Sequence, residues 1–244
     1  MRVRLTRDTI RSGAIRRMIA AQDPSFELLS EAEVRASLAA ILAAPDAPPE
    51  VWVFAYGSLM WNPAFHFVEQ RVALVRGFHR RFCLWAHLGR GSPDAPGLML
   101  GLEAGGSCRG VVYRIAPDAV ASELEIVWLR EMLSRAYRPR WVSAQTPAGA
   151  VRAIAFTINR AHDRYAGRLP DDIVAATIAG ASGNLGPCAD YLFNTVAHLE
   201  ALGIHDRRLA LLRDRVASQC ANTAAPTAAS DSRNPAKVPA RTRK

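Results

Sequence analysis

The segment VWVFAYGSLMW, residues 51–61, begins as an apolar run and is then interrupted by Tyr56, Gly57 and Ser58. An apolar run of this length predicts a buried strand. A glycine at a strand end either makes a turn or lets another group approach the main chain closely. The segment therefore has two interpretations, a plain turn or a binding loop, and the rest of the chain has to decide between them.

Strand patterns surround this segment, and helix patterns stand at both ends of the chain. Alternating and β-branched residues predict strand over 71–87, a hairpin over 97–116 that turns at Gly105 and Gly106, and a hairpin over 141–159 that turns near 147–149. Capping residues and helical spacing predict helices over 30–44, 117–134, 171–182, 186–203 and 206–218. Because strands and helices do not alternate in a βαβ rhythm, this order predicts an α+β fold.

These patterns divide the chain into three parts. Residues 1–48 are expected to form an N-terminal extension with one helix, and residues 49–219 to form the main domain. Residues 220–244 are rich in Ala, Pro, Thr and Ser, a composition that cannot bury a core, so this basic tail is expected to be disordered.

The net charge of +9 lies at the two ends of the chain. Residues 1–17 hold six Arg and one Asp, and residues 221–244 hold three Arg, two Lys and one Asp, so residues 18–220 sum to zero. We therefore expect no nucleic-acid partner for the folded part, and both ends are expected to be dispensable for turnover. The chain also contains no apolar run long enough to span a membrane and no secretory signal, so no membrane partner is expected.

The four cysteines are far apart and form no CxxC pair. This spacing disfavours a disulfide framework or a structural zinc site and fits a cytoplasmic protein with reduced thiols. No metal ligand set is expected, because no HExxH motif or paired metal spacing occurs among His66, His79, His87, His162, His198 and His205. The glycines form neither GxGxxG nor a P-loop, and Ser58 has no GxSxG frame around it.

One carboxylate falls on the apolar face of the helix predicted over 117–134. Val120, Leu124, Val127 and Trp128 recur at helical spacing, and Glu131 lies about 20° from Val120 on the helical wheel. A buried carboxylate is costly unless it is paired or has a chemical role. Two interpretations remain: a salt bridge with a following arginine (Arg135, Arg138 or Arg140), or a general acid–base with a raised pKa.

Four blocks of the sequence resemble the ChaC family, the glutathione-specific γ-glutamylcyclotransferases. The blocks are FAYGSLMWNPAF (54–65), GFHRRFCLW (77–85), WLREMLSRAYRPRW (128–141) and ASGNLGPCADYLFNT (181–195). They occur in the family's order over roughly residues 50–205. The resemblance implies a small twisted β-barrel or mixed sheet with flanking helices, and an enzyme that uses neither a cofactor nor a metal.

The resemblance also implies a site and a reaction. It makes Glu131 the catalytic residue and the strand end the substrate loop, formed by Phe54, Ala55, Tyr56, Gly57, Ser58 and Leu59. The implied enzyme is a lyase in which the glutamyl α-amine of glutathione attacks its own γ-carbonyl, giving 5-oxoproline and Cys-Gly. Tyr137, Tyr191, Arg80 and Arg81 are further candidates for contacts with the substrate, although a core aromatic or a solvated arginine is an equal interpretation of each.

One departure from the family pattern and two alternative functions remain. Relatives often carry a glycine between REM and the following tyrosine, where this chain has Arg135, so a positive φ at that place would strain this chain. The first alternative function is a cyclotransferase for other γ-glutamyl amines or dipeptides. The second is a non-catalytic binding module with basic ends. The sequence does not indicate the oligomeric state.

Overall fold

The computed structural model describes residues 4–224 of the chain. The main strands are β1 (Trp52–Ala55), β2 (Glu69–Ala86), β3 (Gly97–Arg114), β4 (Tyr137–Thr146) and β5 (Gly149–Ile158). Two short strands, β6 (Ser182–Gly183) and β7 (Gly186–Pro187), pair with each other. The helices are α1 (Arg7–Arg11), α2 (Ala14–Gln22), α3 (Glu31–Leu42), α4 (Ser58–Trp61), α5 (Val120–Glu131), α6 (Asp171–Gly180), α7 (Cys188–Ala201) and α8 (Arg207–Ala224), and a 3-10 turn, η1 (Pro117–Ala119), precedes α5.

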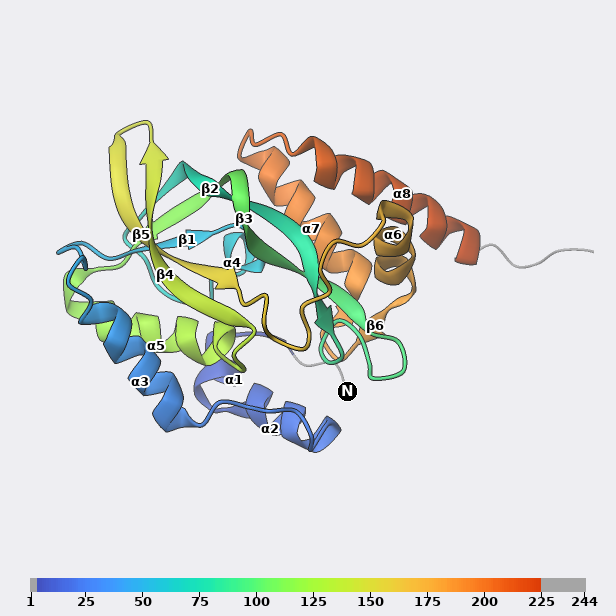
Figure 1. Ribbon diagram of the computed structural model, residues 1–244, viewed down its shortest axis with the longest axis horizontal. Coiled ribbons are helices and arrows are strands. Elements are labelled where there is room, and N and C mark those ends of the chain that lie inside the picture. The colour runs from blue at the N-terminus through green and yellow to red at the C-terminus, as the bar shows by residue number, and fades with distance from the viewer. Residues whose placement is uncertain (1–3, 225–244) are drawn as a thin grey trace, which may run out of the picture.

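The five main strands close into a barrel in the order β1-β3-β2-β4-β5. The pairs are antiparallel except where the barrel closes: β1 lies parallel to β5, with Trp52 opposite Ala153, and Leu102 of β3 lies parallel to Thr157 of β5. Figure 1 shows α3 and α5 on one side of the barrel and α6, α7 and α8 on the other. The α+β prediction is confirmed, and so is the barrel with flanking helices.

The core lies between the barrel and α5. Trp128 on α5 is fully buried and packs edge-on against Phe156 of β5, with the ring centroids 5.1 Å apart. Phe54 and Val53 of β1 are also fully buried, because β1 lies between β3 and β5 in the closed barrel. The apolar run that opens the segment 51–61 is therefore a core strand, and it delivers Tyr56 and Gly57 to one end of the barrel.

The hairpin predicted over 97–116 is wrong. Residues 97–114 form one strand, β3, which pairs along its length with β2. Gly105 and Gly106 have positive φ values of 100° and 72°, but they lie where the register shifts between Arg76 and Phe78 of β2. Two glycines here make a bulge that bends the strand rather than reversing it. The reversal occurs instead in the loop 87–96, and the second hairpin, β4–β5, is confirmed.

The helix predicted over 117–134 is shorter in the structure, where α5 spans Val120–Glu131. Its first residues form the 3-10 turn η1, and α5 ends at Glu131, because Met132 leaves helical geometry with φ −100° and ψ 42°. The following Leu133 accepts a backbone hydrogen bond from Leu29 N–H at 3.0 Å instead of continuing the helix. Glu131 therefore stands at the carboxyl end of α5, where its side chain can reach beyond the helix packing surface.

The N-terminal extension contains more structure than the single helix predicted. Helix α3 has the expected capping box between Ser30 and Glu33, but α1 and α2 precede it. Helix α2 buries Ile15 and Ile19, which are one turn apart. At the other end, α8 continues to Ala224, so residues 220–224 are helical rather than disordered. The rest of the predicted tail, 225–244, lies outside the described residues.

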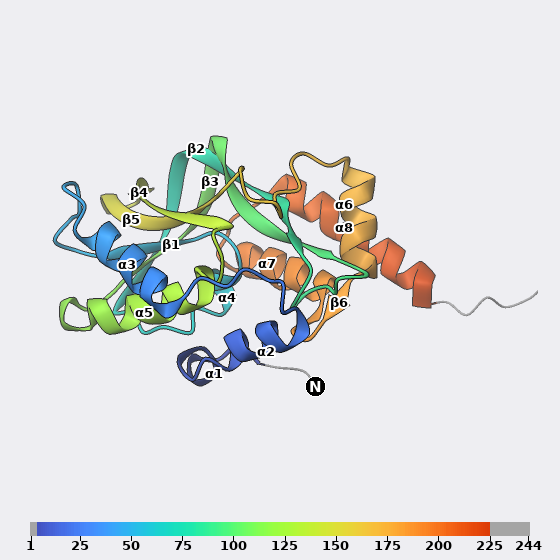
Figure 2. The same ribbon diagram turned by 60° about the horizontal axis from the view of Figure 1, so that its bottom comes forward.

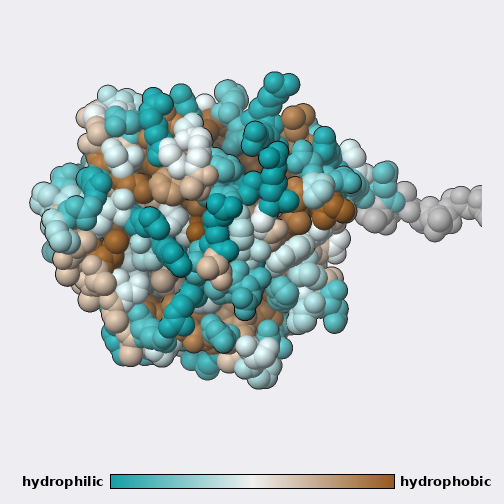
Figure 3. Space-filling view, in the orientation of Figure 1, coloured by the Kyte–Doolittle hydropathy of each residue, from teal (hydrophilic) through white to brown (hydrophobic). Residues whose placement is uncertain are grey.

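The outer surface is mixed in character. The face in Figure 3 is mostly hydrophilic and is interrupted by small hydrophobic areas. No helix within residues 4–224 combines the length and the apolar character that crossing a membrane requires.

Candidate active site

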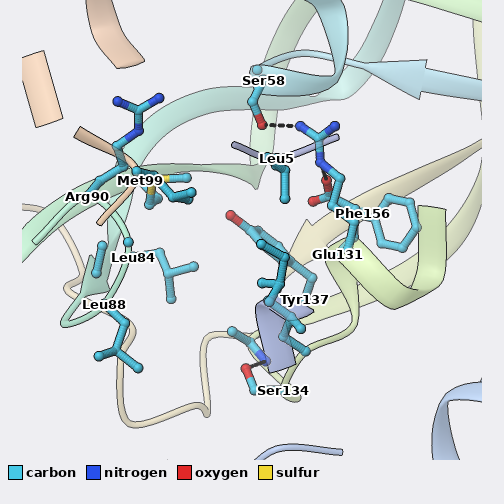
Figure 4. A pocket seen from close by; sticks show the side chains of 18 of the residues that line it. Leu5, Ser58, Leu84, Leu88, Arg90, Met99, Glu131, Ser134, Tyr137 and Phe156 are labelled. Carbon is cyan, nitrogen blue, oxygen red and sulfur yellow. Dashed lines mark hydrogen bonds and ion pairs between the residues drawn. The ribbon is translucent and has the colours of Figure 1, made fainter. Parts of the chain in front are cut away.

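A cavity of about 180 Å³ lies at the end of the barrel where β1 stops. Its walls come from the β1–α4 loop, the end of α5, the loop after β2, the start of β4 and the segment that precedes α3. Figure 4 shows Ser58 and Glu131 on one side of this cavity and Arg90 and Leu88 on the other, with Tyr137 between them. The cavity brings together Tyr56, Gly57, Ser58, Leu59, Glu131, Tyr137 and Tyr191 of the residues predicted from the sequence.

Glu131 is the carboxylate of this cavity. Its side chain is 16% exposed, and Oε1 lies 3.0 Å from Nε of Arg130. Burial raises the pKa of Glu131 above its ordinary value, and Arg130 acts in the opposite direction. The salt-bridge partner is thus the adjacent Arg130, and none of Arg135, Arg138 and Arg140, the partners considered from the sequence, forms an ion pair with Glu131 in the described part of the chain.

A second glutamate on the same helix, Glu123, has its pKa shifted in the opposite direction. Glu123 is 4% exposed and accepts hydrogen bonds from Arg7 and from the His66 backbone N–H, the latter at 2.8 Å. Burial alone would raise the pKa of Glu123, but the hydrogen bonds from Arg7 and His66 hold it below its ordinary value. Two carboxylates whose environments move their pKa values apart have different roles. Glu123 is a structural anchor, and Glu131 is suited to proton transfer.

Arg130 connects the end of α5 to the β1–α4 loop. Its guanidinium donates to Ser58 Oγ at 2.9 Å and to the backbone oxygen of Asn62. The Ser58 hydroxyl is therefore engaged by a cation rather than by a base, which agrees with the lack of a nucleophile motif around it. Since Arg130 also contacts Glu131, it fixes the carboxylate relative to the loop.

Gly57 is required by close packing of its backbone. A Cβ atom at this position would lie 2.8 Å from the hydroxyl oxygen of Tyr191 and 3.6 Å from Cδ1 of Leu100. Helix α4 begins at the next residue, and the first N–H groups of a helix have no intrahelical partners. The strand end therefore places the first main-chain N–H groups of α4 beside the cavity, with the Tyr191 hydroxyl packed closely against Gly57.

Three tyrosines surround this loop and Glu131. The hydroxyl of Tyr56 donates to Phe156 O at 2.8 Å, and that of Tyr137 donates to Leu100 O at 2.7 Å. Burial, reinforced by the charge of Glu131, raises the pKa of Tyr56 and Tyr191. All three phenols therefore stay protonated at neutral pH, so they act as hydrogen-bonding walls and do not compete with Glu131 for protons.

Four predicted substrate contacts lie elsewhere. Phe54 and Ala55 are fully buried in β1 and do not line the cavity. Arg80 donates to the backbone oxygen of Tyr56 at 2.8 Å and pairs with Asp206, while Arg81 pairs with the buried Glu103 of β3. Adjacent side chains in a strand point to opposite faces, and each of these arginines is engaged by groups outside the cavity lining. Arg80 thus supports the main chain before Gly57, and we propose no substrate contact for these four residues.

The place where relatives often have glycine does not strain this chain. Among residues 4–224, the positive φ values of non-glycine residues include only Ala64, with φ 60°. Arg135 therefore has ordinary backbone geometry, and its side chain is exposed and pairs with Glu33 of α3.

One wall of the cavity, not among the residues predicted from the sequence, comes from the N-terminal segment, residues 4–29. The wall residues of this segment are Leu5, Ile10, Ile15, Met18, Ile19 and Phe26. Figure 2 shows α1 and α2 beside α5, running toward β6. The spacing of Ile15, Met18 and Ile19, at i, i+3 and i+4, is the helical signal that could have identified it.

The basic residues of the N-terminal segment hold it in place. Arg7 pairs with Glu123, Arg16 donates to Leu29 O, and Arg17 donates to Ser12 O at 2.7 Å. The amide of Asn62 also donates to Leu5 O at 2.8 Å. The positive charge at this end is therefore partly used for internal contacts.

Deleting residues 1–22 is expected to impair turnover, which replaces our expectation that this end is dispensable. The deletion removes five of the six wall residues and opens the cavity to water, which weakens every electrostatic interaction inside it. We expect KM to rise by about 10-fold or more, the effect of losing roughly 1.4 kcal/mol of binding. Steady-state kinetics and thermal melting of the truncated protein test this, with Arg7→Ala as a milder variant. A truncated protein with unchanged KM would contradict it.

Comparison with known proteins places this architecture in a family. The family model described as ChaC-like protein matches residues 51–219, which include β1, α5 and α7. The chain belongs to the ChaC family. The resemblance found in the four sequence blocks is therefore confirmed.

Individual proteins similar to this chain are glutathione-specific gamma-glutamylcyclotransferases. The chain is 42% identical over 205 residues to the glutathione-specific gamma-glutamylcyclotransferase of Escherichia coli (strain K12), covering 83% of this chain and 87% of the relative. It is 30% identical to glutathione-specific gamma-glutamylcyclotransferase 1 of Homo sapiens, covering 69% of this chain and 79% of that protein. The crystal structure of a gamma-glutamyl cyclotransferase specific to glutathione from yeast has a similar fold, with a TM-score of 0.64 at 21% identity, covering 69% of this chain and 96% of the yeast chain.

Proposed function

We propose that this protein is a glutathione-specific γ-glutamylcyclotransferase, a lyase that converts glutathione to 5-oxoproline and Cys-Gly. Membership of the ChaC family and the names of its relatives support this activity. The observation that carries it is Glu131, a buried carboxyl with a raised pKa in a cavity beside the loop at Gly57.

The reaction suits a site with a single acid–base. The glutamyl α-amine forms a bond to the γ-carbonyl carbon, and the bond from that carbon to the cysteine nitrogen breaks. The substrate provides the nucleophile, so no water is consumed. What the protein contributes is a bent conformation of the γ-glutamyl arm and help in moving protons from the attacking nitrogen, which loses two, to the departing nitrogen, which gains two. Holding the two reacting groups in place removes much of the barrier.

Each group at the cavity has a part in this proposal. Glu131 accepts the proton of the α-ammonium group and returns one to the leaving amine. The main-chain N–H groups of Gly57, Ser58 and Leu59 hold the α-carboxylate or the developing oxyanion. Tyr137 and Tyr191 close the site around the γ-glutamyl arm, and Arg130 keeps Glu131 in position.

Release of 5-oxoproline tests the proposal and its nearest alternative together. Glutathione and γ-glutamyl-alanine are each incubated with the protein at millimolar concentration, and 5-oxoproline is measured over time. Release from glutathione alone supports the proposed substrate. Release from both at similar rates indicates a broader cyclotransferase, and release from neither overturns the proposed function.

The pH dependence of turnover is expected to report the raised pKa of Glu131. The proton acceptor must be ionised, so kcat/KM falls as the pH drops through the folded-state pKa of Glu131, which lies above the ordinary value of about 4.3. The carboxyl groups of the substrate titrate lower, near the α-carboxyl value of about 3.3–3.7. A pH profile of kcat/KM therefore separates them. An acid limb that begins only below the ordinary glutamate value would contradict the assignment.

We also propose that the protein is cytoplasmic and does not bind nucleic acid. Cys83, Cys108 and Cys188 are buried and are not in disulfides, as expected in a reducing compartment. Arg7, Arg16 and Arg17 of the N-terminal segment make internal contacts, so part of the basic charge at this end is used within the fold.

A further inference from the structure

Three arginines line the cavity, and their charges are balanced differently. Arg130 pairs with Glu131 at 3.0 Å. Arg90 and Arg164 form no ion pair with any carboxylate of residues 4–224. A buried cation without a counter-charge is costly, so an unpaired guanidinium at a cavity points to an anionic ligand group. Glutathione, the substrate of the proposed function on which this inference rests, has two carboxylates.

Of Arg90 and Arg164, Arg90 is the less available to bind an anionic group of a ligand. Its Nη1 donates to Pro187 O at 3.0 Å, which joins the loop 87–96 to the start of α7. Burial lowers the pKa of Arg90, and the negative charge of Asp190 partly offsets this decrease. Arg90 thus has a backbone acceptor and an acidic neighbour, which suit a brace between loops.

Arg164 has an unused donor. Its Nη2 donates to Ser134 Oγ at 2.8 Å, and its guanidinium lies 4.7 Å from the ring centre of Phe26. Nε is buried and has no hydrogen-bond partner in the described structure. Arg164 also borders a neighbouring hollow lined by Asp23, Glu27 and Asp163, but no carboxylate of residues 4–224 forms an ion pair with it. Its Nε is therefore left without an acceptor inside the protein.

The position of Arg164 fits the far end of the substrate. The charges of Glu131 and Arg164 both act on the phenol of Tyr137, so that ring lies within reach of both. Ser134, which accepts from Arg164, lies on the side of the Tyr137 ring away from Ser58 in Figure 4. With the γ-glutamyl arm held at Gly57 and Glu131, the rest of the peptide extends past Tyr137 toward Arg164.

We propose that Arg164 binds the C-terminal glycine carboxylate of glutathione and selects the tripeptide over γ-glutamyl compounds that lack this carboxylate. The planar face of Phe26 orients the guanidinium, and Ser134 fixes one of its nitrogens. The carboxylate provides the counter-charge that the Arg164 guanidinium lacks among the described residues. Phe26 belongs to the N-terminal segment, so that segment contributes to substrate selection as well as to the cavity wall.

The test compares glutathione with its C-terminal amide, which keeps the size of the glycine and removes its charge. A hydrogen bond to a charged group contributes roughly 1.5–3 kcal/mol, or about 10- to 100-fold in kcat/KM. We expect the unmodified protein to prefer glutathione by this factor. Arg164→Gln is expected to abolish the preference, mainly through a higher KM for glutathione that approaches the KM for the amide, and Arg164→Lys to keep part of the preference.

Two further arginine variants serve as comparisons. Arg160→Gln removes a positive charge from the same loop, but Arg160 is exposed, faces Glu103 at 3.7 Å and does not line the cavity. It is expected to leave the preference intact. Arg90→Gln tests the other unpaired arginine, and a preference that disappears in Arg90→Gln but survives in Arg164→Gln overturns the proposal.

The remaining outcomes distinguish a failure of the role proposed for Arg164 from a failure of the proposed cyclotransferase activity. If Arg164→Gln impairs both peptides equally and melts earlier, Arg164 is structural and the proposal is wrong. If neither peptide releases 5-oxoproline, the proposed function fails, and calorimetric binding of the two peptides then decides about Arg164. Equal affinity for glutathione and its amide overturns the proposal, and a preference for glutathione that Arg164→Gln abolishes supports it.

Discussion

Glu131→Gln is expected to lower the turnover of glutathione by about 10²–10⁴-fold, the usual contribution of general acid–base catalysis. Glutamine keeps the length and shape of the side chain, but it cannot accept the α-ammonium proton at neutral pH. Substrate binding should largely persist, because the proposed contacts of the substrate backbone are at Gly57–Leu59. The decrease is therefore expected in kcat rather than in KM.

The stability of Glu131→Gln is expected to change little. Removing one partner of a fully buried ion pair costs about 3–5 kcal/mol when the remaining charge is left uncompensated. Arg130, however, also donates to Ser58 Oγ and to Asn62 O, and the amide oxygen of glutamine still accepts from it. We expect a loss of about 1 kcal/mol, the net value of one hydrogen bond.

Glu123→Gln is the matched control, because both glutamates are on α5 and their side chains are only 5% and 16% exposed. Glu123 anchors Arg7 and the His66 backbone and does not line the cavity. Its replacement should lower the melting temperature and leave kcat close to that of the unmodified protein. Melting and 5-oxoproline release are measured on the same samples. If Glu131→Gln melted early and turned over normally, Glu131 would be only a structural partner of Arg130.

Gly57→Ala is expected to lower kcat/KM by about 10²-fold, as small displacements in a site commonly do. The new Cβ meets the Tyr191 hydroxyl at 2.8 Å, so either that ring or the loop must move. KM should carry most of the effect, because the loop is proposed to bind the substrate through its main chain. Gly180→Ala is the control glycine, since nothing lies within 4 Å of a Cβ there.

Combining Gly57→Ala with Tyr191→Phe distinguishes packing from binding. Removing the Tyr191 hydroxyl removes the clash, so the double variant should recover the melting temperature. If substrate must approach the bare main chain at Gly57, KM stays high in the double variant relative to Tyr191→Phe alone. Full recovery of KM would return this loop to the simpler interpretation of a turn.

The fold could be predicted to the level of its elements, and the errors have local causes. The β4–β5 hairpin and the capping box at Ser30 depend on neighbouring residues, and both are as expected. The Gly105–Gly106 pair was interpreted as a turn because a bulge has the same local signature. What distinguishes them is the long-range pairing of β3 with β2, which a sequence pattern does not contain.

The site could be predicted in part. Glu131 stood out because a carboxylate on an apolar face is costly, and Gly57 because it interrupts a core strand. Arg80 and Arg81 do not line the cavity because Asp206 and Glu103, distant in the sequence, engage them, and no local pattern indicates these partners. Arg164 and Phe26 are far apart in the chain and meet only through the tertiary fold, so no local pattern indicates them.

The most direct test of intramolecular cyclisation is the fate of oxygen when glutathione is converted in water enriched in oxygen-18. If the α-amine of the substrate is the nucleophile, no water enters the product. We expect 5-oxoproline of natural isotopic mass, formed in equal amount with Cys-Gly. Free glutamate carrying one oxygen-18 atom would show that water is the nucleophile and would contradict the mechanism proposed for Glu131.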